Sequence, residues 1–507
     1  MAEMKQLAKE TAIYGVSSIV GKFLNWLLVP MYTYVLQNSG QYGIVTNLYA
    51  WTALVIVVIT YGMETGFFRF ASEYKDNKTL SDRVYSTTLC CLAVTSTLFA
   101  LLLIVFRYDV AELLSCGASA NIVAMLGVTV ALDAFDSIPF AYLRYKKKPV
   151  KFAAYKLISI AINILGNIFF LVICPKISNS GAAWLVDWCF RPDYDVEYIF
   201  ITNLISSFVC TLLLLPTILE PKLDFDRMLL RRMLKYSLPI LLLGIVGIMN
   251  QTVDKILFPI VYPDKSDAML QLGIYGACFK VAMIMMMFTN AFRYAYEPFV
   301  FQKHGTSKCK ESYSDAMKYF IIAALMIFLG MVFYLDILKF LLREDYRIGM
   351  NIVPLILISY MFQGIVYNLA LWYKLVDKTY WGAIISSIGF IIMFVMQLLL
   401  IPKFSYWACV WSSVACYFVM MMVSYFVGQK YYPVDYQLKR IAMYVVLAAL
   451  LWAAAMFITI DNFFVRMAYR TILLAIFCVV VIMKDLPLSK LPIIQKLTKR
   501  IKGGSIN

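Results

Sequence analysis

The first long apolar segment of the chain carries a lysine near its middle, where a charge is costly unless it faces water or an opposite charge. Lys22 follows Gly15 and Ser18 and precedes Asn25, and these steps of three and four residues put all four on one helical face. An ammonium group on such a face can bind an anion strongly, because the surroundings are apolar. The alternative is that these four residues serve close packing between helices, through their small and polar side chains.

Polar side chains in other apolar segments are candidates for the same site. When the two halves of the chain are aligned, the face of Lys22 matches a later face that carries Gln251 and Asp254. Two helices with matched polar faces are expected to meet at a central cavity. Arg293 lies about two turns from the end of its segment, so the alternative is that its guanidinium group extends to the membrane–water interface instead of the cavity. The candidate ligand contacts are Lys22, Asn25, Asn47, Gln251, Asp254, Lys280, Asn290 and Arg293.

Carboxylates inside apolar segments form a second group of candidates. Asp133 and Asp136 lie three residues apart on one helical face, and Lys156 follows in the next apolar segment. If Lys156 reaches the two aspartates, the cluster is a buried ion pair. The alternative is that these carboxylates take up a proton or a sodium ion. Asp133, Asp136 and Asp254 are therefore the candidates for coupling to H⁺ or Na⁺.

Glutamates end two of the apolar segments at equivalent positions. Glu64 has Arg69 nearby in sequence, and Glu297 has Arg293 nearby. Ion pairs there could close one end of a cavity, which makes Glu64, Arg69 and Glu297 candidate gate residues. Ordinary solvation of helix ends is the alternative.

The sequence lacks the patterns expected of an enzyme. Its one histidine, His304, falls in a loop, and there is no phosphate-binding glycine loop, metal-ligand cluster or nucleophile constellation. Most cysteines lie within apolar segments without metal or disulfide spacing. Cys174 and Cys189 share one loop, and whether they form a disulfide is left open. We expect no catalysis, no metal and no cofactor, apart from the candidate coupling ion.

Long helices must position these groups. Of 507 residues, 62% are apolar and 15% are charged, and apolar runs of about 18 or more residues recur along the chain. Within a bilayer, helices or closed barrels alone satisfy the backbone, and these unbroken runs lack strand-like alternation. We therefore predict an all-α, polytopic membrane protein with about fourteen transmembrane helices, the first over 11–36.

The basic residues predict the topology. Most of the 46 lysine and arginine residues fall in alternate loops, together with both chain ends. By the positive-inside rule, both termini of this multi-pass protein are cytoplasmic. The net charge of +16 then reflects topology and attraction to anionic lipid headgroups, and we expect no nucleic-acid partner.

The two halves of the chain repeat one pattern at a spacing of about 230 residues. Tyr42-Gly43 recurs as Tyr275-Gly276, and Pro175-Lys176 recurs as Pro402-Lys403. Six spans per repeat is an even number, so the two copies run in parallel through the membrane. We predict an N-lobe over 1–220, a C-lobe over 221–430, and two extra helices with a cytoplasmic tail over 431–507.

Several motifs resemble a known family. Tyr42-Gly43, the run from Gly62 to Tyr74, and the run from Gly181 to Trp184 after Pro175 are similar to bacterial polysaccharide biosynthesis (O-antigen) flippases. Their superfamily also holds multidrug and toxin extrusion transporters and lipid II flippases. The resemblance implies a monomeric O-antigen or capsule flippase. Such proteins move an undecaprenyl-diphosphate-linked oligosaccharide across the inner membrane by alternating access, in contact with membrane lipid.

The resemblance also implies a cationic cavity, which Lys22 and Lys280 match and Asp254 does not. The last two helices resemble a pair that holds the lipid tail in lipid II flippases, although here they carry Arg466 and Arg470.

Two other functions stay open. A cation-coupled multidrug antiporter of the same superfamily would use carboxylates against an organic cation. A polytopic glycan polymerase or ligase would need a large outside loop, and the insertion at 185–204 is short.

Overall fold

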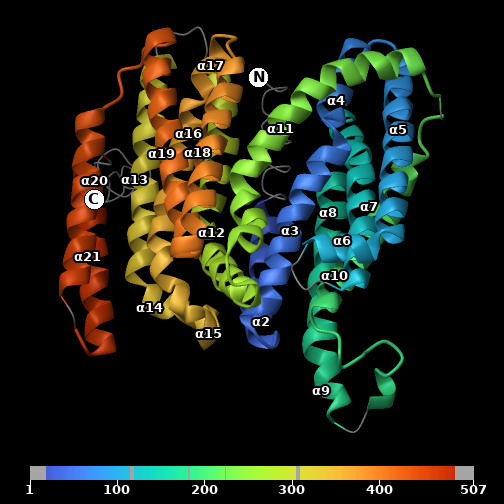
Figure 1. Ribbon diagram of the computed structural model, residues 1–507. Coiled ribbons are helices and arrows are strands. Elements are labelled where there is room, and N and C mark those ends of the chain that lie inside the picture. The colour runs from blue at the N-terminus through green and yellow to red at the C-terminus, as the bar shows by residue number, and fades with distance from the viewer. Residues whose placement is uncertain are drawn as a thin grey trace, which may run out of the picture.

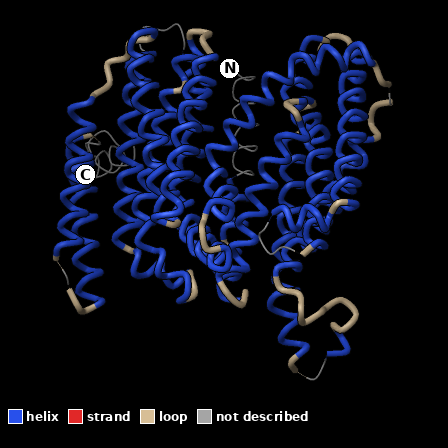
Figure 2. The backbone as a smooth tube through the Cα atoms, in the orientation of Figure 1, coloured by secondary structure: helices blue, strands red, loops and turns tan. Residues whose placement is uncertain are grey.

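The structure, a computed structural model, describes residues 19–114, 119–180, 183–222, 224–303, 309–458 and 460–485. All regular elements in these ranges are helices (Figures 1 and 2). Thirteen of them are long and apolar enough to cross a membrane. The predicted first span, 11–36, lies partly outside the described residues, and its described part is helical over 19–26 and in α2 (Leu28–Val35). The chain is a multi-pass, all-α membrane protein, as predicted.

Two helical bundles stand side by side, and the same neighbour relations recur in both (Figure 1). Each bundle has six long helical units when α3 and α4 are counted as one broken span, as the predicted two-lobe repeat requires. With the segment 19–35, the N-lobe comprises α3 (Ser39–Thr60), α4 (Met63–Glu73), α5 (Lys78–Val105), α7 (Ala120–Tyr145), α8 (Pro149–Ile168) and α10 (Val196–Ile218). The C-lobe comprises α11 (Arg227–Val261), α12 (Lys265–Lys303), α13 (Cys309–Phe333), α16 (Val353–Leu369), α18 (Tyr380–Phe404) and α19 (Tyr406–Tyr431).

Short elements join these helices at the lower end in Figure 1. They include α6 (Arg107–Leu114), α9 (Cys174–Ser178), α14 (Leu335–Leu338) and α15 (Glu344–Arg347), while α17 (Leu371–Leu375) lies at the upper end. Side-chain caps fix several starts: Asn38 accepts from Gln41 N at α3, and Asp226 accepts from two backbone N–H groups at α11.

The second predicted span is broken rather than straight. Tyr61 and Gly62 both have positive φ angles, 32° and 72°, which ends α3 and starts α4 on a new axis. Glycine accepts this left-handed backbone without a steric penalty.

Helix α11 belongs to both lobes. Its first turns bury Leu229 and Met233 in an N-lobe core with Met63 and Phe67, whereas later turns pack on α18 of the C-lobe. The predicted boundary at 221 assigns all of α11 to the C-lobe. The packing instead makes this helix the bridge that crosses between the bundles in Figure 1.

The lobes touch most closely where α3 crosses α12. A Cβ atom on Gly43 would lie 2.0 Å from the backbone oxygen of Met269, and one on Gly273 would lie 1.8 Å from that of Ser39. Glycine is therefore required at both positions for the backbones to approach. Nearby, Arg343 of the C-lobe donates to the backbone oxygens of Leu36 and Gln37 at 2.6 and 2.9 Å. These contacts close the lower end of the interface between the lobes.

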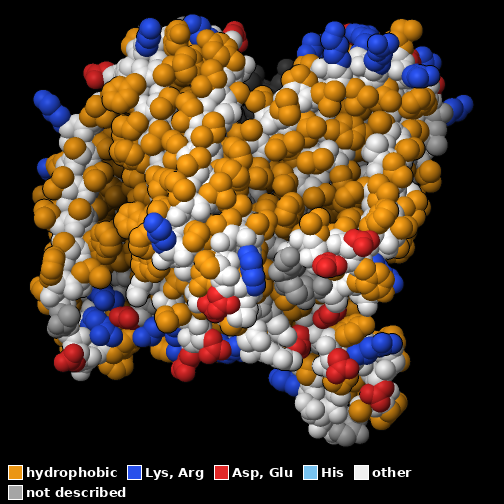
Figure 3. Space-filling view, in the orientation of Figure 1, with side chains coloured by type: hydrophobic (Ala, Val, Ile, Leu, Met, Phe, Trp, Pro, Cys, Tyr) orange, Lys and Arg blue, Asp and Glu red, His pale blue; other side chains and the backbone are white. Residues whose placement is uncertain are grey.

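Charge is distributed unequally over the two membrane faces. Figure 3 shows lysine and arginine side chains crowded along the upper edge, an apolar band below it, and most of the visible acidic side chains along the lower edge. We call the upper edge, with the loops that hold Lys75, Lys147 and Lys222, the basic face.

The two extra helices, α20 (Leu438–Phe457) and α21 (Phe463–Lys484), pack on α13, and ion pairs anchor them to α13 at one end and to α14 at the other. At one end, Asp485 contacts Lys318 at 3.0 Å and Arg440 at 2.9 Å. At the other end, Asp336 contacts Arg466 and Arg470 at 3.0 and 2.8 Å. The two arginines that the sequence places near the outer interface thus have a structural partner.

Asp485 is expected to stabilise this anchorage, since its side chain is 1% exposed and that of Lys318 is 5% exposed. Burial by itself raises the pKa of Asp485, but hydrogen bonds from Tyr444 and Lys318 and the charges of Lys318 and Arg440 outweigh it, and the pKa is lowered overall. A carboxyl group with a lowered pKa stabilises the fold above its unfolded-state pKa, and this contribution is lost as the pH falls through the folded-state value.

Asp485→Asn should lower the stability of the docked pair by about 1.5–3 kcal/mol, because the buried Lys318 would keep only the more exposed Asp315, 3.5 Å away, as a counter-ion. Thermal unfolding of the purified protein in detergent would measure the loss. Asp109→Asn, at an exposed position on α6, is the matched control. Equal unfolding temperatures for the two variants would contradict the prediction.

Candidate functional site

A cavity of about 950 Å³ lies between the lobes and is lined by both of them. The N-lobe contributes the segment 19–26 together with α2, α3, α7, α8 and α10, and the C-lobe contributes α11, α12, α16 and α19. Among the residues predicted from the sequence, the following line this cavity: Lys22, Asn25, Asp133, Asp136, Gln251, Asp254 and Lys280.

Lys22 and Lys280 lie on one region of the cavity wall, although they come from different lobes. The indole Nε1 of Trp26 donates to the backbone oxygen of Lys280 at 2.7 Å. Lys22 precedes Trp26 by one helical turn, which places it beside the same part of α12. Among the described ion pairs, none involves either ammonium group. This region therefore keeps positive charge available for an anion.

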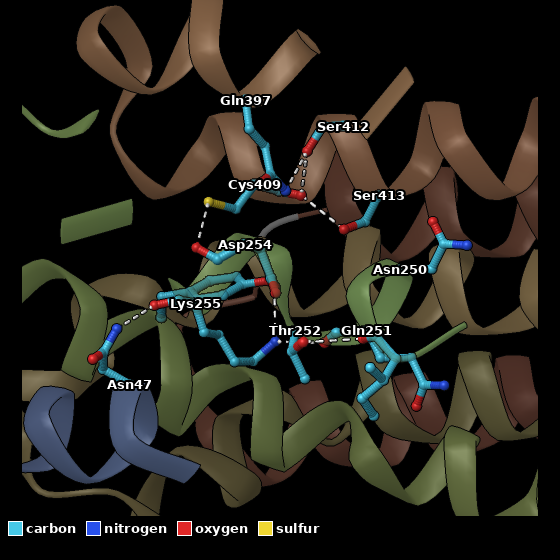
Figure 4. Close-up of polar contacts among 12 residues, drawn as sticks. Asn47, Asn250, Gln251, Thr252, Asp254, Lys255, Gln397, Cys409, Ser412 and Ser413 are labelled. Carbon is cyan, nitrogen blue, oxygen red and sulfur yellow. Dashed lines mark hydrogen bonds and ion pairs between the residues drawn. The ribbon is translucent and has the colours of Figure 1, made fainter. Parts of the chain in front are cut away.

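Asp254 lines the cavity and is held there by neighbouring side chains. Its carboxylate accepts from Lys255 Nζ at 2.7 Å and from the hydroxyl of Tyr275 (Figure 4). Both charged side chains are buried, and Lys255 Nζ also lies 3.7 Å from the centroid of the Phe279 ring. The negative charge of Asp254 is thus balanced within the protein.

The candidate residues named from the sequence do not include Lys255. Its flexible side chain turns back along α11, where Nζ donates to the backbone oxygen of Gln251, and it lines the cavity. The adjacent pair of opposite charges within one span was the signal, because a charge deep in a bilayer pairs where it can.

Three of the predicted ligand contacts, Asn47, Asn290 and Arg293, are not among the residues that line the cavity. Asn47 is fully buried and donates to the backbone oxygen of Lys255 at 2.7 Å, so it joins α3 to α11 (Figure 4). Asn290 lies beyond the part of α12 that faces the cavity, which runs from Tyr275 to Met286.

The two N-lobe aspartates face the cavity from α7. Asp133 accepts from Ser207 Oγ at 2.7 Å, and Asp136 accepts from Thr211 Oγ1 at 3.0 Å. Lys156 does line the same cavity, but its Nζ lies 4.0 Å from the centroid of the Phe140 ring, and no described ion pair joins it to either aspartate. The aspartates are therefore held by hydroxyl groups rather than by a direct ion pair.

A sequence profile of polysaccharide biosynthesis proteins matches residues 7–304, which is more than half of the chain. The chain belongs to the polysaccharide biosynthesis protein family. This confirms the family that the motifs around Tyr42 and Gly62 indicate. No curated protein sequence matches the chain.

Solved transporter structures share the fold of this polysaccharide biosynthesis protein. The lipid II flippase MurJ, in an inward closed conformation, superposes with a TM-score of 0.73 and 13% identity over 93% of this chain and 99% of that chain. An inward-facing multidrug resistance MATE family transporter of the MOP superfamily gives 0.62 and 10% identity over 81% and 95%. The MATE multidrug transporter DinF-BH gives 0.58 and 13% identity over 84% and 95%. At these identities the likeness establishes the fold.

Two of the candidate gate residues of this family member, Glu64 and Arg69, lie outside the cavity lining. Glu64 pairs with Arg144, not with the predicted Arg69, whose guanidinium lies 4.1 Å from the centroid of the Tyr236 ring. The two residues meet because the break at Tyr61 and Gly62 turns α4 toward α7.

The other predicted gate residue, Glu297, and its predicted partner Arg293 both belong to α12. The guanidinium of Arg293 lies 4.8 Å from the Tyr367 ring, and the side chain of Glu297 lies outside the described residues. A gate at these positions stays a prediction.

Proposed function

We propose that this protein is a flippase that moves a polyprenyl-diphosphate-linked oligosaccharide across a bacterial cytoplasmic membrane, for O-antigen or capsule synthesis. The observation that best supports this proposal is the cavity between the lobes, which Lys22 and Lys280 both line. Neither ammonium group has a carboxylate partner among the described ion pairs. Two such groups suit a diphosphate, and apolar surroundings strengthen the attraction. Membership in the polysaccharide biosynthesis family supports this substrate class.

Alternating access follows from the closed lower end of the interface between the lobes. The crossing at Gly43 and Gly273 and the contacts of Arg343 block that end, so the substrate enters from the basic face. The diphosphate then binds at Lys22 and Lys280, and the polyprenyl tail stays in the bilayer. Rocking of the lobes opens the lower end. By the positive-inside rule, the basic face is cytoplasmic, as are both termini.

Deletion of the gene tests the proposal. A lipid-linked glycan should accumulate on the cytoplasmic side of the membrane, and surface polysaccharide should be lost until the gene is restored. Analysis of extracted lipids by mass spectrometry would identify the accumulated species. Normal surface polysaccharide without any accumulation would contradict the proposal.

A multidrug antiporter is the second candidate, because Asp133 and Asp136 face the cavity as an organic-cation site would require. Increased drug sensitivity of the deletion strain, with intact polysaccharide, would favour it. Coupling to H⁺ or Na⁺ stays a prediction. Asp254 already holds Lys255, which leaves Asp133 and Asp136 as the stronger candidates for it. We place a polymerase or ligase last, since transport needs no catalytic group.

A further inference from the structure

Two cysteines outside the cavity meet at the lower end of the N-lobe. Cys174 begins α9, and Cys189 lies in the turn that precedes α10. The two thiols interact directly, and both are neighbours of the Tyr198 side chain on α10. The sequence leaves the pairing of these cysteines open. The structure brings them together, although a whole loop separates them along the chain.

A stack of aromatic rings holds the two segments that carry the cysteines. The ring of Tyr198 stacks on Phe170, which lies about one helical turn before Cys174, with centroids 5.0 Å apart. It also stacks on Phe190, the residue after Cys189, with centroids 5.6 Å apart. Tyr198 is itself buried. Because one buried ring fixes both segments, the approach of the two thiols is a property of the packed core.

The position and accessibility of the thiols suit a disulfide bond. Cys174 is fully buried, whereas Cys189 is half-buried and can be reached by a reaction partner. Figure 1 shows α9 at the lower end of the molecule, opposite the basic face. With the basic face in the cytoplasm, this end lies in the extracytoplasmic compartment, where disulfides can form and persist.

The second half of the chain fills the position of Cys174 without a thiol. The Pro-Lys pair that follows Cys174 also follows Ile401, which is equally buried. In the C-lobe, Ser405 is the one residue between α18 and α19, whereas residues 179–195 join α9 to α10. Packing at this position is therefore satisfied by isoleucine, and the cysteine pair occurs in the lobe that has a loop to close.

The loop ends where the lobes close the cavity. The carboxylate of Asp195, the residue before α10, accepts from Gln37 Nε2 and Gln41 Nε2 at 2.5 and 2.9 Å. The backbone oxygen of Gln37 in turn accepts from Arg343 of the C-lobe. A covalent link at the base of the loop restricts the conformations of the loop. It therefore also holds the N-lobe half of this closure in place.

We propose that Cys174 and Cys189 form a disulfide bond that closes the outer loop of the N-lobe. The oxidant is an exchangeable protein disulfide of the extracytoplasmic compartment. The thiolate of Cys189 attacks one sulfur of that disulfide, whose S–S bond breaks as a mixed disulfide forms. The thiolate of Cys174 then attacks the sulfur of Cys189 and releases the oxidant as a dithiol. Two electrons and the two thiol protons pass to the oxidant.

A cut within the loop tests the disulfide in the full-length protein. A recognition sequence for a site-specific protease is inserted between Asn179 and Ser180, which are both exposed. Cells are treated with N-ethylmaleimide before lysis, so that free thiols cannot oxidise later. After cleavage, the protein should keep its full size in a denaturing gel without reductant and separate into two fragments with reductant. Mass spectrometry of the linked peptides identifies the two sulfurs without any cysteine variant.

The variant Cys189→Ser should separate into two fragments under both conditions, because one of the two sulfurs is missing. Cys478→Ser is the matched control, since Cys478 is also half-buried but lies on α21, and this variant should stay joined without reductant. Separation of the unsubstituted protein without reductant would overturn the proposal, as would joined fragments in Cys189→Ser. Fragments that stay joined only when N-ethylmaleimide is omitted would show oxidation after lysis and overturn it too. None of these outcomes depends on the transported substrate, so the proposed function is judged separately by the deletion experiment.

Discussion

Replacing Lys22 and Lys280 together by glutamine is expected to reduce glycan export by about a hundredfold or more. A hydrogen bond to a charged group contributes about 1.5–3 kcal/mol, so the loss of two such contacts amounts to about 3–6 kcal/mol. Each 1.4 kcal/mol corresponds to a factor of about ten. Glutamine keeps most of the side-chain length and polarity, and neither lysine has a described ion-pair partner that the change would leave unpaired.

Export in a deletion strain that carries each variant would measure this effect, with the amount of protein in the membrane determined in parallel. Lys75→Gln/Lys222→Gln is the matched control, since it removes the same charge from exposed positions on the basic face. Full export by the cavity variant would show that these lysines do not anchor the substrate. Equal losses in both double variants would point to net charge or topology instead.

Gly43→Ala should prevent closure of the lower end of the cavity. The added methyl group would lie 2.0 Å from the backbone oxygen of Met269, an atom that cannot rotate away, so α3 and α12 must separate. Overpacking of this kind costs about 1–3 kcal/mol, which shifts a two-state equilibrium by about fivefold to a hundredfold. The conformation open to the lower end would gain population, and export would fall because the cycle needs both states.

An engineered cysteine at Asn25, which lines the cavity, reports the shift when the native cysteines have been replaced. In the Gly43→Ala background, a membrane-impermeant maleimide added outside the cell should label it several times faster. Gly247→Ala is the control, because a Cβ atom there would meet nothing within 4 Å. Unchanged labelling and export for Gly43→Ala would show that this crossing does not govern access.

Much of the fold follows from patterns that are local in the sequence. A bilayer must be spanned by apolar helices, so long apolar runs indicate where helices lie, and thirteen of them meet this description in the structure. The helix ends were less predictable: the second span bends at Tyr61 and Gly62, where the backbone turns left-handed within an apolar stretch. The sequence also did not predict that α11 packs on both lobes, because its residues form one continuous apolar span.

The candidate site was predictable in part for a similar reason. Helical periodicity places Lys22 with Asn25 and Gln251 with Asp254, and all four line the cavity. Periodicity does not say how far a cavity extends along a helix, and this is why Asn290 lies beyond it. Nor does it say which neighbour a face meets, and Asn47 meets the backbone of α11.

Local patterns in the sequence were enough to predict an all-α membrane protein with two repeated lobes, and to indicate the polysaccharide biosynthesis family and the lysines within apolar spans. Which polar groups share a space depends on the tertiary packing. Tertiary packing turned Lys255 onto Asp254, paired Glu64 with Arg144, and brought the N-lobe aspartates into one cavity with Lys22 and Lys280. The physical reason is that a helix fixes the relative directions of its own side chains. The rotation, crossing and neighbours of each helix depend on packing between segments that are far apart in the chain.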